Sequence, residues 1–207
     1  MALKIELGQL AKCSASVQTS NLEIFLNNLN LIHIEKIMDC WPQIINLKTK
    51  YGIGEVIGKG GFGTVYAGIR KNDGKTIAIK HFSKENVTYW DFIDGRKVPL
   101  ELKLLSQVQE VKGVISLLDF YESSDSFIIV MEKPTECKVL FDYITEMGPL
   151  KEDLARNFFR QLVEIIIACH SKGVIHRDIK DENLIIDTST LELKLIGKNY
   201  FQLRSLL

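Results

Sequence analysis

The chain has 207 residues, enough for one large domain or two small ones with a substantial buried core. Lysine plus arginine and aspartate plus glutamate balance at 26 each, so no overall field favours nucleic acid or an anionic membrane surface. The four cysteines lie far apart without a C-x-x-C pair, which argues against a zinc site or a disulfide framework and fits a reducing compartment.

The N-terminus has no basic segment followed by a long apolar run, and no uncharged apolar stretch reaches transmembrane length. We therefore expect a soluble intracellular protein, in the cytoplasm and with the nucleus as a second location. We also expect a monomer that binds neither nucleic acid nor membrane.

Residues 1–50 are expected to form an N-terminal appendage to the main domain. Apolar residues recur at helical spacing over 22–38, which indicates one helix. This segment either packs on the main domain or is partly disordered. Trp41-Pro42 is expected to break the structure that precedes it, which places the domain boundary between residue 42 and Tyr51.

Residues 51–131 predict a small lobe of five antiparallel strands and one main helix. Short turn signals such as Asn72-Asp73-Gly74 separate the apolar runs and favour antiparallel connections. Pro99 suits the first position of the helix, where a missing N–H has no cost. The expected strands are 51–57, 64–70, 76–80, 114–120 and 126–131, and the helix runs from Pro99 to about Val108.

Helical patterns dominate residues 132–196. A short helix is expected over 140–145 and a long one over 150–170, with Gly173 as a left-handed cap at its end. Residues 162–169 are apolar almost all round, so this part of the long helix is expected to be buried on most sides. The residues that follow can hardly provide that cover, which predicts an unstable or aggregation-prone chain.

A glycine-rich turn joins the first two strands. Three glycines at G-x-G-x-x-G spacing permit a tight turn and let backbone N–H groups approach phosphate closely. The turn joins two strands and does not lead into a helix, unlike the dinucleotide-binding loop that shares the spacing. A glycine-rich hairpin without a ligand is the alternative. The segment reads Gly58, Lys59, Gly60, Gly61, Phe62, Gly63, Thr64 and Val65.

Lys80 and Glu101 form a candidate ion pair. Lys80 ends the Ile77-Ala78-Ile79-Lys80 strand, and alternation points its side chain away from that of Ile79, toward the space beneath the glycine turn. Glu101 falls in the first turn of the helix that begins at Pro99. A solvated lysine and a solvated helix glutamate are the alternatives.

Residues 174–186 hold a polar cluster between two apolar segments. Asp178 provides a potential base, Lys180 a fixed cation, and Asn183 an amide that could meet a metal ion. Rigid apolar neighbours suit a site because they fix where the charges point. The spacing His176-Arg177-Asp178-x-Lys180-x-x-Asn183 matches the H-R-D-x-K-x-x-N catalytic loop of protein kinases.

In this order the motifs resemble a eukaryotic protein kinase, and Lys180 is the serine/threonine variant. The chain is similar to the Pim family over residues 51–196. The shared segments include Ala78-Ile79-Lys80-His81, Arg96-Lys97-Val98-Pro99 and the hinge Glu132-Lys133-Pro134. The resemblance implies an α+β, protein-kinase-like fold: a small lobe over 51–131, the first part of a mainly helical large lobe over 132–196, and an unrelated tail over 197–207.

The resemblance also implies the cofactors and the site. ATP would lie against Ile57, the glycine turn, Val65, Ala78 and Glu132, with Lys80 on its phosphates and Glu101 holding Lys80. Pro134 lacks an N–H, so the hinge can donate one hydrogen bond fewer to adenine. Asp178 would act as base, Lys180 would offset charge on the transferring phosphoryl group, and Asn183 would hold Mg²⁺.

The implied substrates are serine or threonine residues in proteins rich in arginine and lysine. Asp142 and Glu182 match acidic family positions that meet substrate arginines. Val139 stands where the family has an aspartate, which weakens the expected preference for basic peptides.

The resemblance stops after Ile196. The family continues with Asp-Phe-Gly, whereas this chain reads Gly197-Lys198-Asn199, so a metal-binding aspartate is missing and the kinase sequence is expected to be incomplete. A catalytically inactive nucleotide-binding or decoy protein is therefore the alternative to an active kinase.

Overall fold

The computed structural model describes residues 41–61, 63–196 and 201–202. All of them belong to the second of two compact units, Met1–Asp39 and Cys40–Leu207. The helix expected over 22–38 lies outside the described residues, as does most of the 197–207 tail. Within the described residues, no helix is long and apolar enough to cross a membrane.

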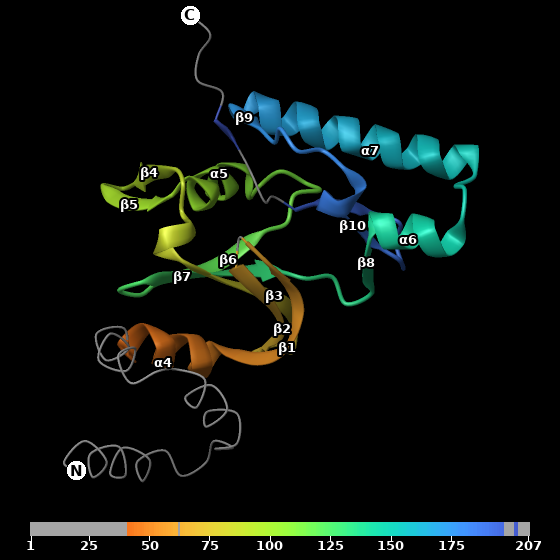
Figure 1. Ribbon diagram of the computed structural model, residues 1–207. Helices are drawn as coiled ribbons and strands as arrows, with labels where there is room; N and C mark the ends of the chain where they lie inside the picture. The colour runs from red at the N-terminus through yellow and green to blue at the C-terminus, as the bar shows by residue number, and fades with distance from the viewer. Residues whose placement is uncertain (1–40, 62, 197–200, 203–207) are drawn as a thin grey trace, which may run out of the picture. The chain divides into compact units, whose positions relative to one another are not determined.

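A five-stranded antiparallel sheet with the order β1-β2-β3-β7-β6 forms the small lobe (Figure 1). It confirms the five strands expected from the sequence. Their bounds are β1 Tyr51–Gly60, β2 Gly63–Arg70, β3 Thr76–Ser83, β6 Leu117–Glu122 and β7 Ser126–Glu132. Alternation along β3 buries Ile77 and Ile79 in one small core, while Phe82 joins the larger core on the other face.

The main helix, α5 (Leu100–Val108), follows a hairpin that the sequence analysis did not predict. The hairpin pairs β4 (Trp90–Ile93) with β5 (Arg96–Pro99) around Asp94 and Gly95. These two turn residues have φ values of 48° and 79°, the positive values that a tight two-residue hairpin turn requires. Pro99 ends β5 and is the N-cap of α5, one position before the expected one.

The N-terminal boundary expected between residue 42 and Tyr51 falls within a helix that the sequence analysis did not predict. A helix, α4 (Trp41–Lys50), occupies that segment and leads directly into β1. Its Leu47 is only 2% exposed and packs in a core cluster with Tyr51, Ile77 and Tyr121. Residues 41–50 therefore belong to the small lobe and not to an appendage.

The large-lobe segment combines two helices with a second, three-stranded sheet. The helices are α6 (Leu140–Met147) and α7 (Glu152–Ser171), close to their expected positions. The sheet has the order β11-β10-β8, from β8 (Cys137–Val139), β10 (Leu184–Asp187) and β11 (Leu193–Leu195). A short strand β9 (Val174–Ile175) pairs with β12 (Phe201–Gln202), and the 3₁₀ turns are η1 (Lys84–Asn86) and η2 (Asp181–Asn183).

One continuous core joins the two parts of the described chain, from Phe127 and α5 to β10, β11 and α7. Gly113 lies at their junction with a φ of 89°, and a Cβ added there would lie 2.5 Å from Ile165 Cδ1 of α7. A side chain would therefore separate α7 from the loop between α5 and β6.

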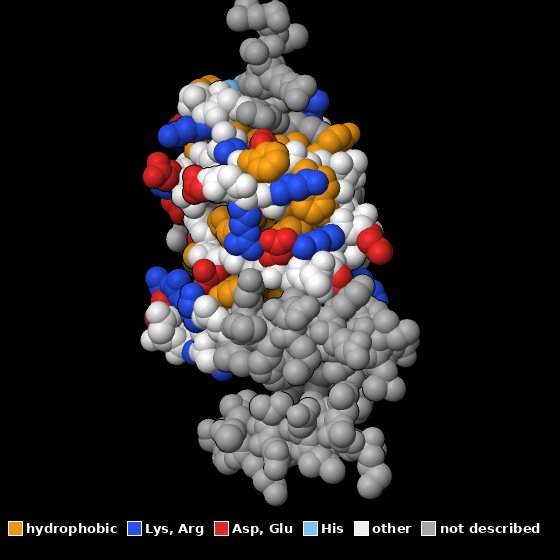
Figure 2. Space-filling model, turned by 90° about the vertical axis from the view of Figure 1, so that its left-hand side faces the viewer, with side chains coloured by type: hydrophobic (Ala, Val, Ile, Leu, Met, Phe, Trp, Pro, Cys, Tyr) orange, Lys and Arg blue, Asp and Glu red, His pale blue; other side chains and the backbone are white. Residues whose placement is uncertain are grey.

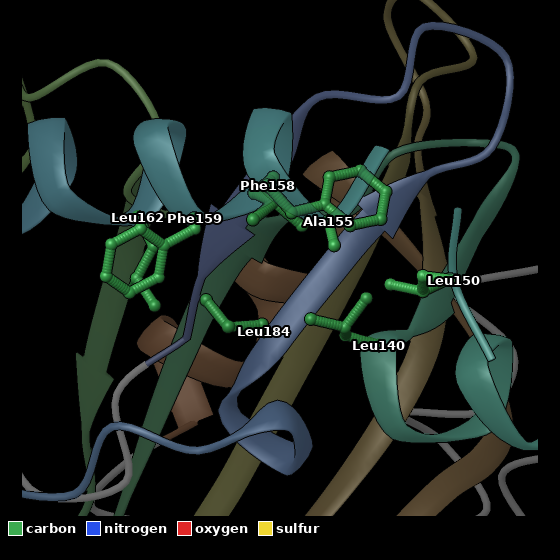
Figure 3. Close-up of a pocket in the computed structure, with 8 residues that line it drawn as sticks. Leu140, Leu150, Ala155, Phe158, Phe159, Leu162 and Leu184 are labelled. Atoms are coloured by element: carbon green, nitrogen blue, oxygen red, sulfur yellow. The ribbon is translucent and has the colours of Figure 1, made fainter. Parts of the chain in front are cut away.

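The expectation that residues 162–169 are buried on most sides is only half correct. Ile165 and Cys169 are buried, whereas Ile167 is 63% exposed and Val163 is also exposed. Beside this face, Leu140, Phe158, Leu162 and Leu184 line an apolar hollow between α6, α7 and β10 (Figure 3). Because the apolar residues surround the helix, one element cannot bury all of them.

Replacing Leu47 with alanine tests whether α4 is part of the folded lobe. We expect a loss of about 2–5 kcal/mol in the free energy of unfolding, because the change leaves a cavity in a close-packed cluster. Urea denaturation measures the effect, and Asn46→Ala on the exposed face of the same helix should change it by less than about 0.5 kcal/mol. Equal stability of the two variants would contradict the packing of α4.

Replacing Ile167 with lysine tests the exposed face of α7. We expect a higher soluble concentration at unchanged melting temperature, because a charge breaks up an exposed apolar surface without disturbing the core. The matched change two residues away, Ile165→Lys, buries an unpaired charge and should abolish cooperative unfolding. The two variants are compared by sedimentation and thermal denaturation.

Candidate active site

The glycine turn closes the hairpin between β1 and β2. Gly60 pairs with Gly63, and a Cβ added at Gly60 or Gly61 would meet nothing within 4 Å. Gly63 is different, because its φ is 110° and a Cβ there would lie 2.3 Å from the carbonyl oxygen of His81. The tip is therefore open above and anchored to β3 at Gly63. Phe62 lies outside the described residues.

Three expected site residues share one face of the sheet. Val65 of β2 lies directly opposite Lys80 of β3, and Ala78 is two positions away on the same strand. Opposed residues and residues two apart point to the same side of a sheet. Gly58 is opposite Val65 and continues this face, whereas the next pair, Lys59 and Thr64, points to the other side of the sheet. Ile57, next to Gly58 on β1, is 46% exposed.

The ion pair between Lys80 and Glu101 is confirmed. Lys80 Nζ lies 2.6 Å from Glu101 Oε1 and 2.7 Å from Oε2. The lysine is 7% exposed, and its ammonium also lies 5.2 Å from the centre of the Phe82 ring. Burial raises the pKa of the Glu101 carboxyl, and the adjacent ammonium limits that rise. The pair therefore holds a lysine side chain at a fixed point below the glycine turn.

The loop after β9 brings Asp178, Lys180 and Asn183 together. Asn183 Nδ2 donates to Asp178 Oδ2 at 2.9 Å and to the Asp178 carbonyl oxygen at 2.7 Å. Lys180 Nζ lies 4.0 Å from Asp178 Oδ2 and 2.8 Å from Glu182 Oε2. The carboxylate that is the candidate base is thus oriented by a buried amide and faces a cation. Its side chain is 35% exposed, so a substrate can reach it.

Asn183 has an unused buried oxygen. The residue is fully buried, and among the described residues its Oδ1 has no hydrogen-bond partner. A buried amide oxygen without a partner is unfavourable unless a cation or a water molecule satisfies it. An amide oxygen beside a carboxylate is also the kind of ligand that Mg²⁺ prefers. Asn183 therefore fits the expected metal ligand.

Two hydrogen bonds at Ile196 clamp the loop. Ile196 N donates to the Asn183 carbonyl oxygen at 3.0 Å, and the Ile196 carbonyl oxygen lies 3.1 Å from His176 Nε2. His176 Nδ1 accepts from the backbone N–H of Asp178 at 3.3 Å. His176 is 4% exposed, and its burial lowers the pKa of the imidazole, although Ile196 and Asp178 oppose the shift. The neutral imidazole thus bridges the candidate base and the end of β11.

Glu132 occupies the hinge with its side chain bound internally. Its Oε1 accepts from Lys194 Nζ at 2.8 Å and from the backbone N–H of Ser116 at 3.0 Å. The side chain therefore ties the hinge to Ser116 and to Lys194.

Sequence reasoning assigned no role to two residues that hold the site. His176 is named only as the first residue of the catalytic-loop motif, and its position directly after the apolar Val174-Ile175 could have indicated a buried polar side chain. Lys194 could not have been found in this way, because its partner Glu132 is 62 residues away in the sequence. Within the described residues, no hydrogen bond or ion pair joins Lys80 or Glu101 to Asp178, Lys180 or Asn183.

Lowering the pH should reduce the free energy of unfolding, because unfolding lets the buried imidazole of His176 take up a proton. Unfolded histidine binds a proton near pH 6.5, whereas the buried imidazole does so only at lower pH. The stability that neutral His176 contributes is therefore complete above about pH 6.5 and is lost as the pH falls toward the folded-state pKa.

We expect His176→Asn to flatten the fall in the free energy of unfolding between about pH 7.5 and about pH 5.5, measured by urea denaturation. His170→Asn, at an exposed position of α7, should keep the wild-type slope. Identical slopes for all three proteins would contradict this role of His176.

Comparison with known proteins agrees with this geometry. The chain is 40% identical to the serine/threonine-protein kinase pim-2 of Danio rerio, an alignment that covers 90% of this chain and 59% of the relative. It is 39% identical to the serine/threonine-protein kinase prk-2 of Caenorhabditis elegans, over 88% of this chain and 39% of the relative. The chain thus spans little more than half of the first relative and less than half of the second.

A solved structure shares the fold. The crystal structure of Rad53 residues 1–466 in complex with AMP-PNP matches with a TM-score of 0.61 and 30% identity, over 74% of this chain and 39% of that one. The family model for the protein kinase domain matches residues 51–197 of the chain. Because this region runs from β1 to the end of β11 and includes both halves of the site, the chain belongs to the protein kinase family.

Proposed function

We propose that the protein is a serine/threonine protein kinase that transfers the γ-phosphate of ATP to a serine or threonine hydroxyl. The observation that carries the proposal is the Asp178–Asn183 arrangement. One buried amide orients the carboxylate through its nitrogen and keeps its own oxygen free beside it. Base and metal ligand are thereby positioned together.

The nucleotide would bind on the face formed by the glycine turn and β3. The open tip at Gly60 and Gly61 leaves backbone N–H groups accessible to phosphate oxygens. Lys80 would donate to the α- and β-phosphates while Glu101 keeps its ammonium in place. Val65 and Ala78 would pack against the adenine. The hinge from Glu132 to Pro134 would accept and donate through its backbone, with one donor fewer at the proline.

In the transfer step, Asp178 would accept the proton of the substrate hydroxyl as that oxygen attacks the γ-phosphorus. A well-placed general base contributes about 10²–10⁴-fold to the rate. Lys180, 4.0 Å from the Asp178 carboxylate, would offset the charge on the moving phosphoryl group. His176 and Asn183 would hold the loop rigid, so that the carboxylate needs no reorganisation during the step.

Asn183 Oδ1 would hold a Mg²⁺ ion, which when bound neutralises negative charge on the phosphates. The sequence has glycine at position 197, where the resemblance expects a second metal ligand, an aspartate. The loss of one such ligand corresponds to a rate lower by about 10³-fold or more. We therefore infer a second candidate function, nucleotide binding without efficient turnover, which the residue at 197 favours.

The proposed substrates are proteins with basic residues near the phosphorylated hydroxyl. Asp142 of α6 is exposed, and Glu182 beside the loop is 54% exposed. Both carboxylates can meet substrate guanidinium groups, although Glu182 is already paired with Lys180. Val139 is uncharged and stands where the family has an aspartate, so it adds no carboxylate for substrate binding. We expect a preference for basic peptides that depends mainly on Asp142.

Replacing Asp178 with asparagine tests the proposal. We expect a fall in kcat of about 10²–10⁴-fold with little change in the KM for ATP, because the change removes the base and keeps the shape of the side chain. Radiolabel transfer from ATP to an arginine-rich serine peptide in the presence of Mg²⁺ measures the rate. Asp153→Asn, at an exposed position of α7, is the matched control.

The transfer assay, together with calorimetry of nucleotide binding, separates the two candidate functions. Transfer that Asp178→Asn abolishes and Asp153→Asn retains supports the kinase. Nucleotide binding in calorimetry without any transfer would favour the second candidate. Transfer that is equal in the wild type and Asp178→Asn would contradict the assigned base.

A further inference from the structure

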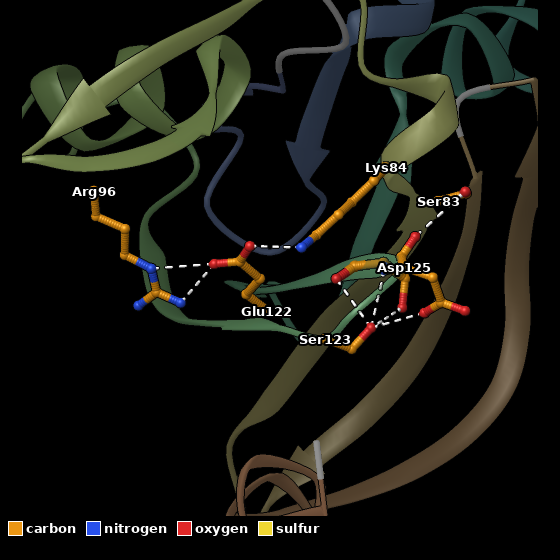
Figure 4. Close-up of polar contacts among 7 residues, drawn as sticks. Ser83, Lys84, Arg96, Glu122, Ser123 and Asp125 are labelled. Atoms are coloured by element: carbon orange, nitrogen blue, oxygen red, sulfur yellow. Dashed lines mark hydrogen bonds and ion pairs between the residues drawn. The ribbon is translucent and has the colours of Figure 1, made fainter. Parts of the chain in front are cut away.

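An ion-pair network ties the β4–β5 hairpin to the rest of the sheet. Glu122, the last residue of β6, uses its two oxygens for two different cations (Figure 4). Its Oε1 lies 2.6 Å from Lys84 Nζ, just after β3. Its Oε2 accepts from Arg96 Nη2 at 2.8 Å and from Arg96 Nε at 3.2 Å. Arg96 is the first residue of β5, so one carboxylate joins β6, the end of β3 and the hairpin.

The Glu122 side of this network is rigid. The turn after Glu122 is closed by Ser123 Oγ, which lies 2.9 Å from Asp125 Oδ1 and 2.9 Å from the backbone N–H of Ser126. The Asp125 carbonyl oxygen accepts from the backbone N–H of Lys84 at 2.8 Å. The turn and the end of β3 are thus bonded through the backbone, and Glu122 is held at the base of this turn.

On the hairpin side, Val98 is fully buried in the larger core, whereas Arg96, beside the turn, is partly exposed. The Arg96 side chain is 49% exposed, and its guanidinium lies 5.2 Å from the centre of the Phe120 ring, on the same strand as Glu122. The outer side of this region carries apolar side chains among separate basic and acidic ones (Figure 2). Trp90 of β4 packs against Phe127 with ring centres 5.9 Å apart, and Lys97 Nζ lies 4.8 Å from the centre of the Trp90 ring.

The position of the hairpin sets the start of α5. Pro99 ends β5 and caps α5, and Leu100 N, at the first residue of the helix, donates to the Tyr89 carbonyl oxygen at 2.9 Å. Glu101 follows immediately and reaches Lys80. Only four peptide bonds separate Arg96 from Leu100 in the sequence. The Arg96 tether therefore acts on the hairpin four residues before the first turn of the helix that carries Glu101.

We propose that Glu122 is a positioning residue that, through Arg96 and the hairpin, holds Glu101 against Lys80. The proposal rests on the proposed kinase function for its catalytic consequence, but its structural consequence is independent of activity. Burial opposes ionisation of Glu122, yet its hydrogen bonds to Lys84 and Arg96 hold the pKa of the carboxyl below its usual value. The carboxylate is therefore charged at neutral pH, and its loss would leave Lys84 and Arg96 as two adjacent, repelling cations.

The network offers a matched pair of variants. Glu122→Gln removes the tether and leaves the two cations facing each other, so we expect the hairpin and Glu101 to shift. Lys84→Gln removes the other ion pair and leaves Arg96 bound to Glu122, so we expect the hairpin to stay. Arg96→Gln cuts the same tether at a more exposed position and serves if Glu122→Gln does not fold. Glu110→Gln, at an exposed position after α5, is the neutral control.

Two measurements on the full chain follow the two ends of the proposed linkage. Acrylamide quenching of Trp90 fluorescence, in a Trp41→Phe background, reports the hairpin. The rate at which acetic anhydride modifies Lys80, measured by mass spectrometry, reports the ion pair. We expect Glu122→Gln and Arg96→Gln to raise the quenching constant of Trp90 and the modification rate of Lys80 by about two- to fivefold. This range corresponds to the free energy of a partly exposed ion pair. Lys84→Gln and Glu110→Gln should stay near the wild type.

Kinetics give a third measurement where the wild type transfers phosphate. Glu122→Gln should raise the KM for ATP and lower kcat while leaving the KM for the peptide unchanged. Unchanged Lys80 modification in both tether variants would overturn the proposal. A similar rise in Lys84→Gln would also overturn it, because general destabilisation would then explain the effect. If the wild type shows no transfer, the proposed function fails, and the quenching and modification rates still decide the role of Glu122.

Discussion

The ion pair between Lys80 and Glu101 sets the requirements for the rest of the small lobe. Removing two charges from water is unfavourable, and the attraction compensates only when the geometry is held closely. β3 fixes the lysine, because Ile77 and Ile79 anchor the strand in one core and Phe82 in the other. α5 fixes the glutamate through Leu102 and Leu105 of the larger core. The start of that helix depends on the hairpin before it, which is the least buried of these supports.

The catalytic loop depends on one residue that performs no chemistry. Ile196 binds Asn183 through its N–H and His176 through its carbonyl oxygen, so the end of β11 and the loop are locked together. In the sequence, Ile196 immediately precedes position 197, where the resemblance expects a metal-binding aspartate.

Sequence reasoning found what depends on local spacing. The Lys80–Glu101 pair and the Asp178 loop follow from alternation on a strand, the first turn of a helix and one short motif. It failed on α4, because Pro42 lies in the first helical turn, where a missing N–H costs nothing. It failed on the β4–β5 hairpin, whose four-residue strands give no clear period. Contacts such as Glu122 with Lys84, 38 residues apart, have no sequence signal at all.

β11 connects the segments that hold the two halves of the site. Its Lys194 binds Glu132 of the hinge, and its Leu195 exchanges backbone hydrogen bonds with Gly113 and Ile115, in the segment after α5. Ile196, the residue after the strand, clamps the Asp178 loop. Three residues in a row therefore connect the hinge, the far end of the helix that bears Glu101, and the loop that bears the base. A short strand can do this because alternate residues face opposite sides, so one side chain serves the hinge while the backbone serves the other two.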